Sequence, residues 1–248
     1  GGSTILNLEI RNFPGAGICI QSDHNVIQGN RIHGNRGDGI CIVDGNNNRI
    51  GGTGVGEANQ IYENDGDGVS VRGGSAAVPP TGNAILSNRI TANGGLAIDL
   101  GENGITENVY PPGPSSPLVR PSPPTAVNEG VNSPMLSFAS VPGIAPPYGV
   151  ALPYSVVEGS LLTWPNTTFR VQIYLTDGNA DIRGEGSVLI GEGTVTTDSR
   201  GYASFSIAST DDLAYGQFVT ATATDLDAST LLPKNTSEFS TNLSVGVK

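Results

Sequence analysis

The chain has few charged residues, and the basic ones are the scarcer kind. Lys and Arg number 12 in 248 residues, Asp and Glu number 23, and the formal net charge is −11. A protein that grips nucleic acid phosphates presents clustered basic side chains. The composition therefore argues against a nucleic acid as partner.

Long apolar segments and uninterrupted helix-forming segments are also missing. The sequence has no run of 18 apolar residues, so we expect no span of a membrane. Gly (35 residues) and Pro (17 residues) recur throughout, and both interrupt helices. This composition favours many short strands joined by turns.

The first hundred residues contain a repeat. The pattern Gly-apolar-x-apolar begins at Gly17, Gly39, Gly68 and Gly95. The pattern Asn-x-Ile begins at Asn30, Asn59 and Asn88, and a further Asn follows at Asn35, Asn64 and Asn93. The unit is 22 residues long at first and 29 residues where Gly- and Pro-rich insertions occur. Insertions that spare the apolar positions are typical of a solenoid.

The repeat predicts stacked coils of β-strands. Its apolar residues alternate, as in Ile18 and Ile20, and this period of two indicates strands. About 22 residues suffice for three short strands and three turns, and equivalent Asn side chains can hydrogen-bond from coil to coil. We therefore expect about four parallel coils over residues 1–104.

The combined signature Asn-x-Ile-x-x-Asn followed by Gly-Ile-x-Ile resembles the parallel β-helix repeats of the pectin-lyase-like superfamily. The resemblance covers residues 3 to about 104 and implies a right-handed parallel β-helix. Large exported bacterial proteins carry similar regions, commonly followed by a sandwich module. The resemblance specifies function poorly, because the superfamily includes lyases, hydrolases, adhesins and inert stalks.

The second half of the chain predicts a β-sandwich. A Pro-rich linker or strap is expected over residues 105–134, and the sandwich over residues 135–248. Seven strands are expected, at residues 135–141, 157–162, 167–176, 187–197, 202–208, 217–225 and 237–245. From about residue 131 to 245 the sequence resembles an immunoglobulin-like module. The predicted fold is therefore all-β, a short right-handed parallel β-helix plus a seven-stranded immunoglobulin-like β-sandwich.

The two cysteines are expected to stack. Cys19 and Cys41 lie one coil unit apart, at a position that Ser70 and Ala97 are expected to fill in later coils. A strained disulfide and a pair of reduced thiols both fit this spacing. Reduced thiols are favoured, because stacked strands hold the Cβ atoms further apart than a disulfide prefers.

No catalytic residue is predicted. The outward carboxylates expected at turns are Asp23, Asp38, Asp44, Asp65 and Asp67, and they share no coil position in our alignment of the repeat. The resemblance implies that an enzyme of this fold would use an Asp cluster, with Ca²⁺ and an Arg base in the lyases. His24 and His33 are expected to be exposed turn residues without a nucleophile partner.

One loop of the second half has the spacing of a calcium loop. Asp177, Asn179 and Asp181 place oxygen ligands at alternate positions. Ile182 and Val188 stand where an EF-hand has its Gly and its bidentate Glu. An ordinary turn is the favoured interpretation, so no cofactor is expected and Ca²⁺ is only a weak candidate.

The predicted function is a non-catalytic structural or adhesive protein at the cell surface, secreted as a fragment or processed piece, and a subunit of a filament or stalk. The coil that begins at Thr4 should expose unpaired backbone groups, so like subunits or flanking repeats are the expected partners. The alternative is a β-helix protein that binds or cleaves a carbohydrate such as a surface glycan. Only Phe13 and Tyr62 supply aromatic rings for it before residue 100.

Overall fold

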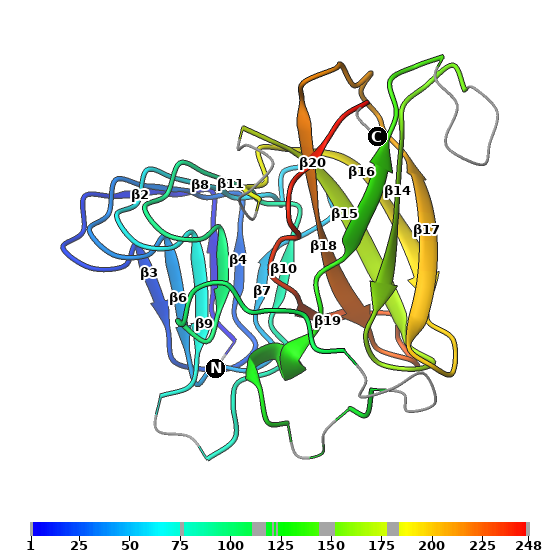
Figure 1. Ribbon diagram of the computed structural model, residues 1–248. Helices are drawn as coiled ribbons and strands as arrows, with labels where there is room; N and C mark the ends of the chain where they lie inside the picture. The colour runs from blue at the N-terminus through cyan, green and yellow to red at the C-terminus, as the bar shows by residue number, and fades with distance from the viewer. Residues whose placement is uncertain are drawn as a thin grey trace.

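Short parallel strands build the first part of the computed structural model (Figure 1). The structure describes all residues except 1, 75–76, 111–117, 121, 123, 144–151, 178–183 and 247–248. In the described part up to residue 100, twelve strands form three parallel sheets of four strands each. Four stacked coils each contribute one strand to every sheet, so the predicted parallel coils and their number are confirmed.

The three sheets are named here sheet A, sheet B and sheet C. Sheet A contains β1 (Thr4–Leu6), β4 (Val26–Gln28), β7 (Arg49–Gly51) and β10 (Ala84–Leu86). Sheet B contains β2 (Glu9–Arg11), β5 (Arg31–His33), β8 (Gln60–Tyr62) and β11 (Arg89–Thr91). Sheet C contains β3 (Ile18–Ile20), β6 (Ile40–Val43), β9 (Val69–Arg72) and β12 (Ile98–Leu100).

Aliphatic ladders fill the interior of the coils. In sheet B the central isoleucines stack in register as Ile10, Ile32, Ile61 and Ile90, and the last three are at most 1% exposed. Each fully buried isoleucine contributes roughly 1.5–3 kcal/mol of hydrophobic stabilisation relative to an exposed one. In sheet B the central residue of each strand points inward, so its two flanking residues point outward.

Asparagine ladders hold the corners of the coils. Asn30, Asn59 and Asn88 form one ladder, in which Oδ1 of Asn59 and of Asn88 accepts the backbone N–H of the Asn one coil earlier, at 2.9 and 3.0 Å. The Nδ2 groups of Asn30 and Asn59 donate to the next Oδ1 in the same ladder at 3.0 and 2.9 Å. Asn35, Asn64 and Asn93 form a second ladder of the same kind. Both predicted ladders are confirmed.

A third ladder was not predicted. It runs through Asn25, Asn48 and Asn83, with backbone-to-side-chain hydrogen bonds of 2.8 and 3.1 Å. These residues also begin Asn-x-Ile segments, but their spacings of 23 and 35 residues differ from the 22 and 29 of the recognised repeat. The signal was therefore present in the sequence and was obscured by the insertions.

The second half forms two antiparallel sheets. The three-stranded sheet contains β13 (Met135–Ala139), β14 (Val156–Leu162) and β17 (Tyr202–Ala208). The five-stranded sheet contains β16 (Val188–Thr196), β15 (Thr168–Thr176), β18 (Phe218–Leu226), β19 (Pro233–Thr236) and β20 (Leu243–Ser244). A separate apolar core that includes Val171, Ile190 and Phe205 fills the space between them. No helix in the described residues is long and apolar enough to cross a membrane.

The strand predicted at residues 237–245 is wrong. The described residues contain eight sandwich strands instead of seven, because β19 and β20 flank an irregular segment at that place. In this segment the hydroxyls of Ser237 and Ser240 accept hydrogen bonds from the backbone N–H groups of Ala223 and Ala221, both at 3.0 Å. Side-chain hydroxyls thus accept the N–H groups beside β18, while the N–H groups of Ser237 and Ser240 donate to the carbonyls of Ala223 and Ala221 at 2.9 and 2.8 Å. Phe239 of this segment packs into the core of the coils.

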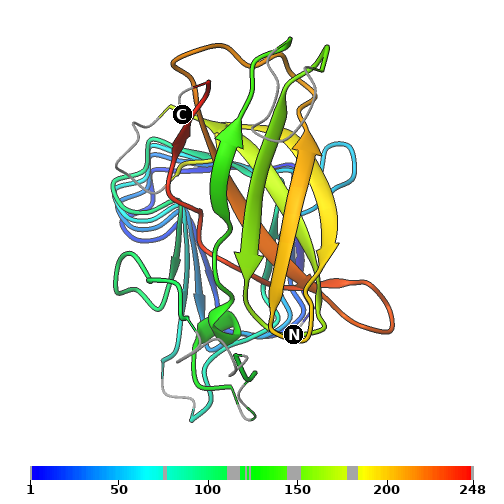
Figure 2. The ribbon, with the colours of Figure 1, turned by 45° about the vertical axis from the view of Figure 1, so that its right-hand side comes forward.

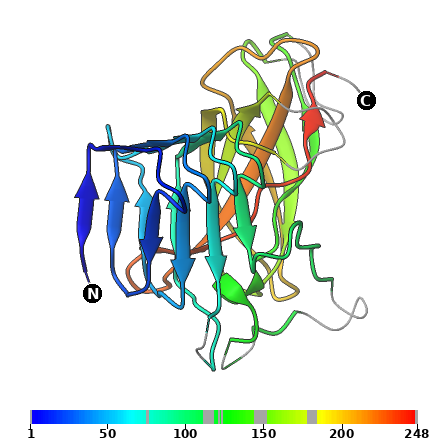
Figure 3. The same cartoon turned by 90° about the vertical axis from the view of Figure 1, so that its left-hand side faces the viewer.

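The five-stranded sheet covers the C-terminal end of the β-helix (Figures 2 and 3). Tyr174 of β15 and Phe239 belong to the aliphatic core of the coils and are 2% and 3% exposed. Their rings meet edge to face with centroids 5.3 Å apart. Burial raises the pKa of the Tyr174 phenol, which therefore stays neutral.

Side chains of the sandwich and of the strap (residues 105–134) also form hydrogen bonds with the backbone of the last coil. The N–H groups of Ile85, Ser87 and Leu100 donate to Thr236 Oγ1, Tyr174 Oη and Glu238 Oε1, at 2.9, 3.1 and 3.1 Å. The third Asn ladder ends in the short 3₁₀ helix η1 (Val127–Gly130), where Asn128 Oδ1 accepts the N–H of Asn83 at 3.2 Å. The end of the coil stack is thus closed by apolar and by polar contacts.

The Asn ladders generate a prediction for Asn59. The change Asn59→Ala should lower the free energy of unfolding by about 2–4 kcal/mol, because it removes the side-chain partners of the buried Ile27 carbonyl and Asn30 N–H. Urea denaturation measures the effect. Gln60→Ala removes an exposed amide one residue away and should change stability by less than about 0.5 kcal/mol. Equal effects of the two variants would contradict a structural role for the ladder.

The closed end generates a prediction for Tyr174. Tyr174→Ala should lower the free energy of unfolding by about 3–4 kcal/mol, because it opens a cavity between the coils and the sandwich. Tyr174→Phe should cost about 1 kcal/mol, because it removes only the hydroxyl that meets Ser87 and Gln172. Thermal or urea unfolding measures both. Tyr215→Ala, a control at a residue 64% exposed, should be nearly neutral, and a neutral Tyr174→Ala would show that the contact is dispensable.

Candidate functional site

The outer face of sheet C carries a column of reactive residue types. Cys19, Cys41, Ser70 and Asp99 stack in register on β3, β6, β9 and β12. The prediction that Ala97 continues this column is wrong. Ala97 stacks against Gly68 instead, because the 29-residue unit is maintained in the last coil and the Gly95 match to the Gly-apolar pattern is coincidental.

The predicted stacking of the two cysteines is confirmed. Cys19 and Cys41 are directly paired in register, and both are free thiols in the structure. Cys19 is exposed and Cys41 is buried. Burial raises the pKa of the Cys41 thiol, so it is a weak nucleophile.

Two carboxylates beside this column share a coil position. Asp38 and Asp67 are 29 residues apart and both precede a Gly at the start of a sheet C strand. Asp38 Oδ1 accepts the N–H of Asp67 at 2.9 Å, and Asp67 Oδ1 accepts the N–H of Leu96 at 2.7 Å. The expectation that the outward carboxylates share no coil position is therefore wrong for this pair. The pair escaped notice because the insertion after the second coil displaces it from the 22-residue spacing.

The carboxylates beside sheet C repel each other's charges. Burial raises the pKa of Asp67 to about 6, and the nearby charges of Asp99 and Asp38 add to the effect. Burial also raises the pKa of Asp99. Asp38 Oδ2 accepts a hydrogen bond of 2.6 Å from the hydroxyl of Ser70.

The same carboxylates bind backbone groups of the fold. Asp99 accepts the N–H groups of Asn103 and Gly104 at 3.3 and 3.0 Å, as Asp38 and Asp67 accept those of the next coil. The raised pKa of Asp67 suits a general acid near neutral pH, yet its Oδ1 accepts a hydrogen bond from the backbone N–H of Leu96. In the described ranges no group of three or more His, Cys, Asp or Glu side chains is placed to hold a metal ion.

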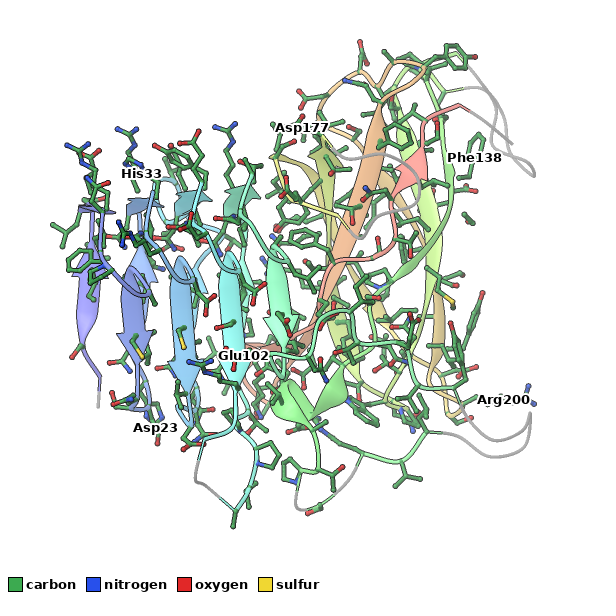
Figure 4. All side chains as sticks on the ribbon, turned by 60° about the vertical axis from the view of Figure 1, so that its left-hand side comes forward. Asp23, His33, Glu102, Phe138, Asp177 and Arg200 are labelled. Atoms are coloured by element: carbon green, nitrogen blue, oxygen red, sulfur yellow. The ribbon has the colours of Figure 1, made fainter. Side chains whose placement is uncertain are left out.

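The other predicted carboxylates have separate backbone or solvent contacts, and Figure 4 shows Asp23. Asp23 accepts the backbone N–H of Asn46 at 2.7 Å, which lowers the pKa of Asp23. Asp44 accepts the N–H of Gly74 at 2.6 Å, and Asp65 is an exposed turn residue. None of the three joins Asp38 and Asp67.

The weak calcium candidate is only partly described. Asp177 is exposed directly after β15, and Asn179 and Asp181 lie outside the described residues. Figure 4 shows Asp177 on the sandwich, beyond the coils.

A pocket of about 350 Å³ lies between the last coil and the strap. Leu100, Val127 and Val131 supply apolar walls, and Glu107 and Glu238 supply carboxylates. Both oxygens of Glu238 accept backbone N–H groups, from Leu100 at 3.1 Å and Thr106 at 3.0 Å. This carboxylate thus serves to join the two parts of the chain.

The outer face of sheet B differs in chemistry from sheet C. The outward residues of its strands are Glu9, Arg11, Arg31, His33, Gln60, Tyr62, Arg89 and Thr91, and they are named here the sheet B face. They stand in two columns, with one residue of each column in every coil. The face is predominantly basic, in contrast to the whole chain.

A ring stack organises the middle of the sheet B face. His33 and Tyr62 stack with centroids 4.7 Å apart and ring planes within 4°. Arg31 Nη2 donates to Tyr62 Oη at 2.9 Å, and His33 Nε2 lies 3.1 Å from Glu9 Oε1 (Figure 4). The expectation of an exposed turn residue is wrong for His33, which ends strand β5 and has a largely covered side chain. His24 does lie exposed in a turn.

Comparison with known proteins supports the fold of the first part. Residues 1–75 match a family model described as a right-handed β-helix region. None of the curated proteins matches the chain. One similar solved structure is the enzymatically active domain of tailspike protein 2 of bacteriophage CBA120, with 13% identity and a TM-score of 0.16. The alignment covers 90% of this chain and 44% of that one, and a similarity this low carries no argument about function.

The raised pKa of Asp67 generates a prediction about pH. The folded protein holds this proton more tightly than the unfolded chain, so the stabilisation by the neutral carboxyl is complete below about pH 4 and is lost as the pH rises to about 6. Asp67→Asn should therefore raise the free energy of unfolding by about 1–2 kcal/mol at pH 7.5, a value already reduced for partial exposure. At pH 4 the variant should match the wild type.

Urea titrations at both pH values, followed by the fluorescence of Trp164, measure this difference. Asp65→Asn is the matched control, because it removes an exposed carboxylate from the same coil. The interpretation fails when Asp67→Asn gains no more stability at pH 7.5 than Asp65→Asn does.

Proposed function

We propose that the chain is a non-catalytic structural and adhesive module of a secreted surface protein, whose sheet B face binds an acidic polysaccharide. The observation that carries this proposal is the row of Arg11, Arg31 and Arg89 on one face of the β-helix. Such a row is unexpected in a chain with a net charge of −11. A local basic surface on an acidic protein attracts anionic ligands specifically to that surface.

The charges of the sheet B face favour an anionic ligand. Glu9 is neutralised within the face by Arg11, at 3.7 Å, and by the hydrogen bond to His33. In the described part of the chain, Arg31 and Arg89 have no carboxylate within ion-pair distance. Their guanidinium groups are exposed and retain donors for a carboxylate ligand.

The spacing of the arginines favours an extended ligand. Successive coils are about 4.8 Å apart, so Arg31 and Arg89, two coils apart in one column, are separated by roughly 10 Å. Arg11 lies one coil below Arg31 in the other column. A linear polymer of uronate residues carries carboxylates at regular intervals and can meet all three. Gln60, exposed between Arg31 and Arg89, supplies a partner for sugar hydroxyls.

The aromatic rings contribute stiffness to this face. His33 and Tyr62 stack on each other along the β-helix, so their stacked faces are occupied and unavailable to a sugar ring. The pair instead fixes Arg31 through the tyrosine hydroxyl. Recognition by charge and hydrogen bonding is therefore favoured over recognition by stacking.

The use of the sheet C carboxylates supports a non-catalytic role. Hydrolysis of a sugar chain uses, in most enzyme families, two carboxylates with oxygens free for the reaction. Asp38, Asp67 and Asp99 instead accept backbone N–H groups of neighbouring segments. The immunoglobulin-like character of the sandwich and the extracellular location belong to the same proposal, and the two antiparallel sheets support the former.

Binding to polygalacturonate at low salt, measured by affinity electrophoresis, tests the proposal. Arg31→Gln and Arg89→Gln should each weaken binding about three-fold and the double variant about ten-fold, because exposed charge pairs contribute ~0.2–1 kcal/mol each. Added salt should weaken binding by the wild type. Arg200→Gln, an exposed charge on the sandwich, is the matched control and should have no effect (Figure 4).

Three results oppose the proposal. Equal binding of neutral dextran would contradict recognition by charge. Equal losses of binding in Arg31→Gln, Arg89→Gln and the control Arg200→Gln would contradict a site on the sheet B face. Dextran sulfate distinguishes the anionic group, because binding of the sulfated polymer alone would rule out a uronate ligand.

A further inference from the structure

Two segments of the strap and the end of the last coil surround the pocket of about 350 Å³. Residues 106–109 belong to one segment, and residues 125–127 and 130–133 belong to the other, which includes η1. η1, the green helix in Figure 3, lies beside the C-terminal end of the coils. Leu100 of β12 and Glu238 of the segment between β19 and β20 also line the pocket. The coils, the strap and the sandwich therefore all contribute to it.

Reciprocal amide hydrogen bonds join the two strap segments. Asn108 Nδ2 donates to the carbonyl of Ser133 at 2.9 Å, and Asn108 Oδ1 accepts the N–H of Ser133 at 2.9 Å. Asn132 bonds Val109 in the same way, since its Oδ1 accepts the N–H of Val109 at 2.9 Å and its Nδ2 donates to the carbonyl at 2.7 Å. These bonds fix the separation of the two segments that line the pocket.

Each strap segment is also bonded to the rest of the molecule. Asn128 of η1 donates its N–H to the carbonyl of Pro80 at 2.9 Å, and its Nδ2 donates to the carbonyls of Asn83 and Thr236 at 2.8 and 3.1 Å. The N–H of Thr106 donates to Glu238 Oε2 at 3.0 Å. The pocket is therefore preformed, and a ligand binds without first ordering its walls.

The interior of the pocket is apolar, and its solvent side is not. Leu100 and Val131 are 7% and 5% exposed, and Val127 also packs against the aliphatic core of the coils. Val109, which is 58% exposed, and the exposed Glu107 lie on the solvent side. A volume of about 350 Å³ falls in the range of pockets that hold small organic molecules. The pocket thus suits a molecule with a hydrocarbon body and one polar end.

The lining of the pocket carries negative charge. Glu107 and Glu238 supply two carboxylates, and among the described residues that line the pocket none is Lys, Arg or His. Glu238 is 4% exposed, and a charge that is shielded from water acts more strongly on a nearby charge than one in bulk solvent does. The pocket therefore attracts cations and repels anions.

We propose that this pocket binds a small organic ammonium ion with an apolar body. The body packs between Leu100, Val127 and Val131, and the ammonium group, which has three hydrogen-bond donors, lies toward the two carboxylates. A bare metal ion is too small to contact the apolar walls, and an anion meets two like charges. The site is separate from the sheet B face, which is basic and for which an anionic polymer is proposed.

Three probes with the same carbon skeleton test the proposal: 2-phenylethylamine, 2-phenylethanol and 3-phenylpropionate. Each is titrated to 50 mM at pH 7 into the whole chain, and the backbone amide NMR signals of Leu100, Gly101 and Thr106 report binding at the pocket. The amine should shift these signals with a dissociation constant of about 1–10 mM, as expected for a ligand of this size. The alcohol should bind at least about five-fold more weakly, because it has no charge, and the carboxylate should cause no shift.

Two variants test the roles of charge and space in the pocket. Glu107→Gln removes one exposed charge and should weaken binding of the amine about three-fold. Glu63→Gln, which changes an exposed glutamate of the third coil outside the lining, is the matched control and should leave binding unchanged. Val127→Phe places a larger side chain in the pocket and should weaken binding at least about ten-fold. Circular dichroism melting checks that each variant is folded, and Glu107→Gln decides the test when Val127→Phe is not.

Several outcomes would overturn the proposal. They are the absence of shifts at 50 mM amine, shifts confined to residues outside the pocket, equal binding of the amine and the alcohol, equal effects of Glu107→Gln and Glu63→Gln, or full binding by a folded Val127→Phe variant. None of them affects the binding of polygalacturonate, which is measured on the sheet B face with Arg31→Gln and Arg89→Gln.

Discussion

The contact between the last coil and the five-stranded sheet is the constraint on which the rest of the structure depends. A β-helix that simply ended at Leu100 would expose its aliphatic interior and the backbone groups of three strands. Tyr174 and Phe239 close the interior, and polar groups of Thr236 and Glu238 take the backbone N–H groups of the last coil. The sandwich is therefore part of the solenoid's core as well as a module with a core of its own.

Most polar groups of the coils have a structural role, and those on the outer face of sheet B differ from them. Buried asparagines join one coil to the next, and the third ladder reaches η1 through Asn128. The carboxylates of sheet C fix the neighbouring backbone, at the cost of a raised pKa for Asp67. Sheet B does not need carboxylates to fix its backbone, because its corners are held by the asparagines. Its outward side chains form the surface that we propose binds a polysaccharide.

The periodic features were predictable and the non-periodic ones were not. The spacing of Asn30 and Asn59 predicts the parallel register, because the ladders at the corners recur at the same place in each coil. The sequence also contained the third ladder, but insertions change its spacing. The coincidental match at Gly95 led to Ala97 instead of Asp99 as the last residue of the sheet C column. The surface on sheet B required the register, since Arg31 and Tyr62 are 31 residues apart and meet only in the folded stack.

The closure itself could not be derived from the sequence. Ser87 and Tyr174 lie 87 residues apart, and no repeat or motif relates them. Phe239 appeared as an ordinary residue of a sandwich strand, because alternation alone does not indicate which of two cores a side chain enters. Such contacts depend on the docking of two elements, and only the three-dimensional arrangement reveals them.

Cooperative unfolding of the two parts tests the closure most directly. In a Cys19→Ser variant, thiol labelling of buried Cys41 reports the β-helix, and the fluorescence of Trp164 reports the sandwich during the same urea titration. Coincident midpoints are expected, because loss of the sandwich opens the core of the coils. Labelling of Cys41 at a urea concentration that leaves the Trp164 signal native would contradict the account.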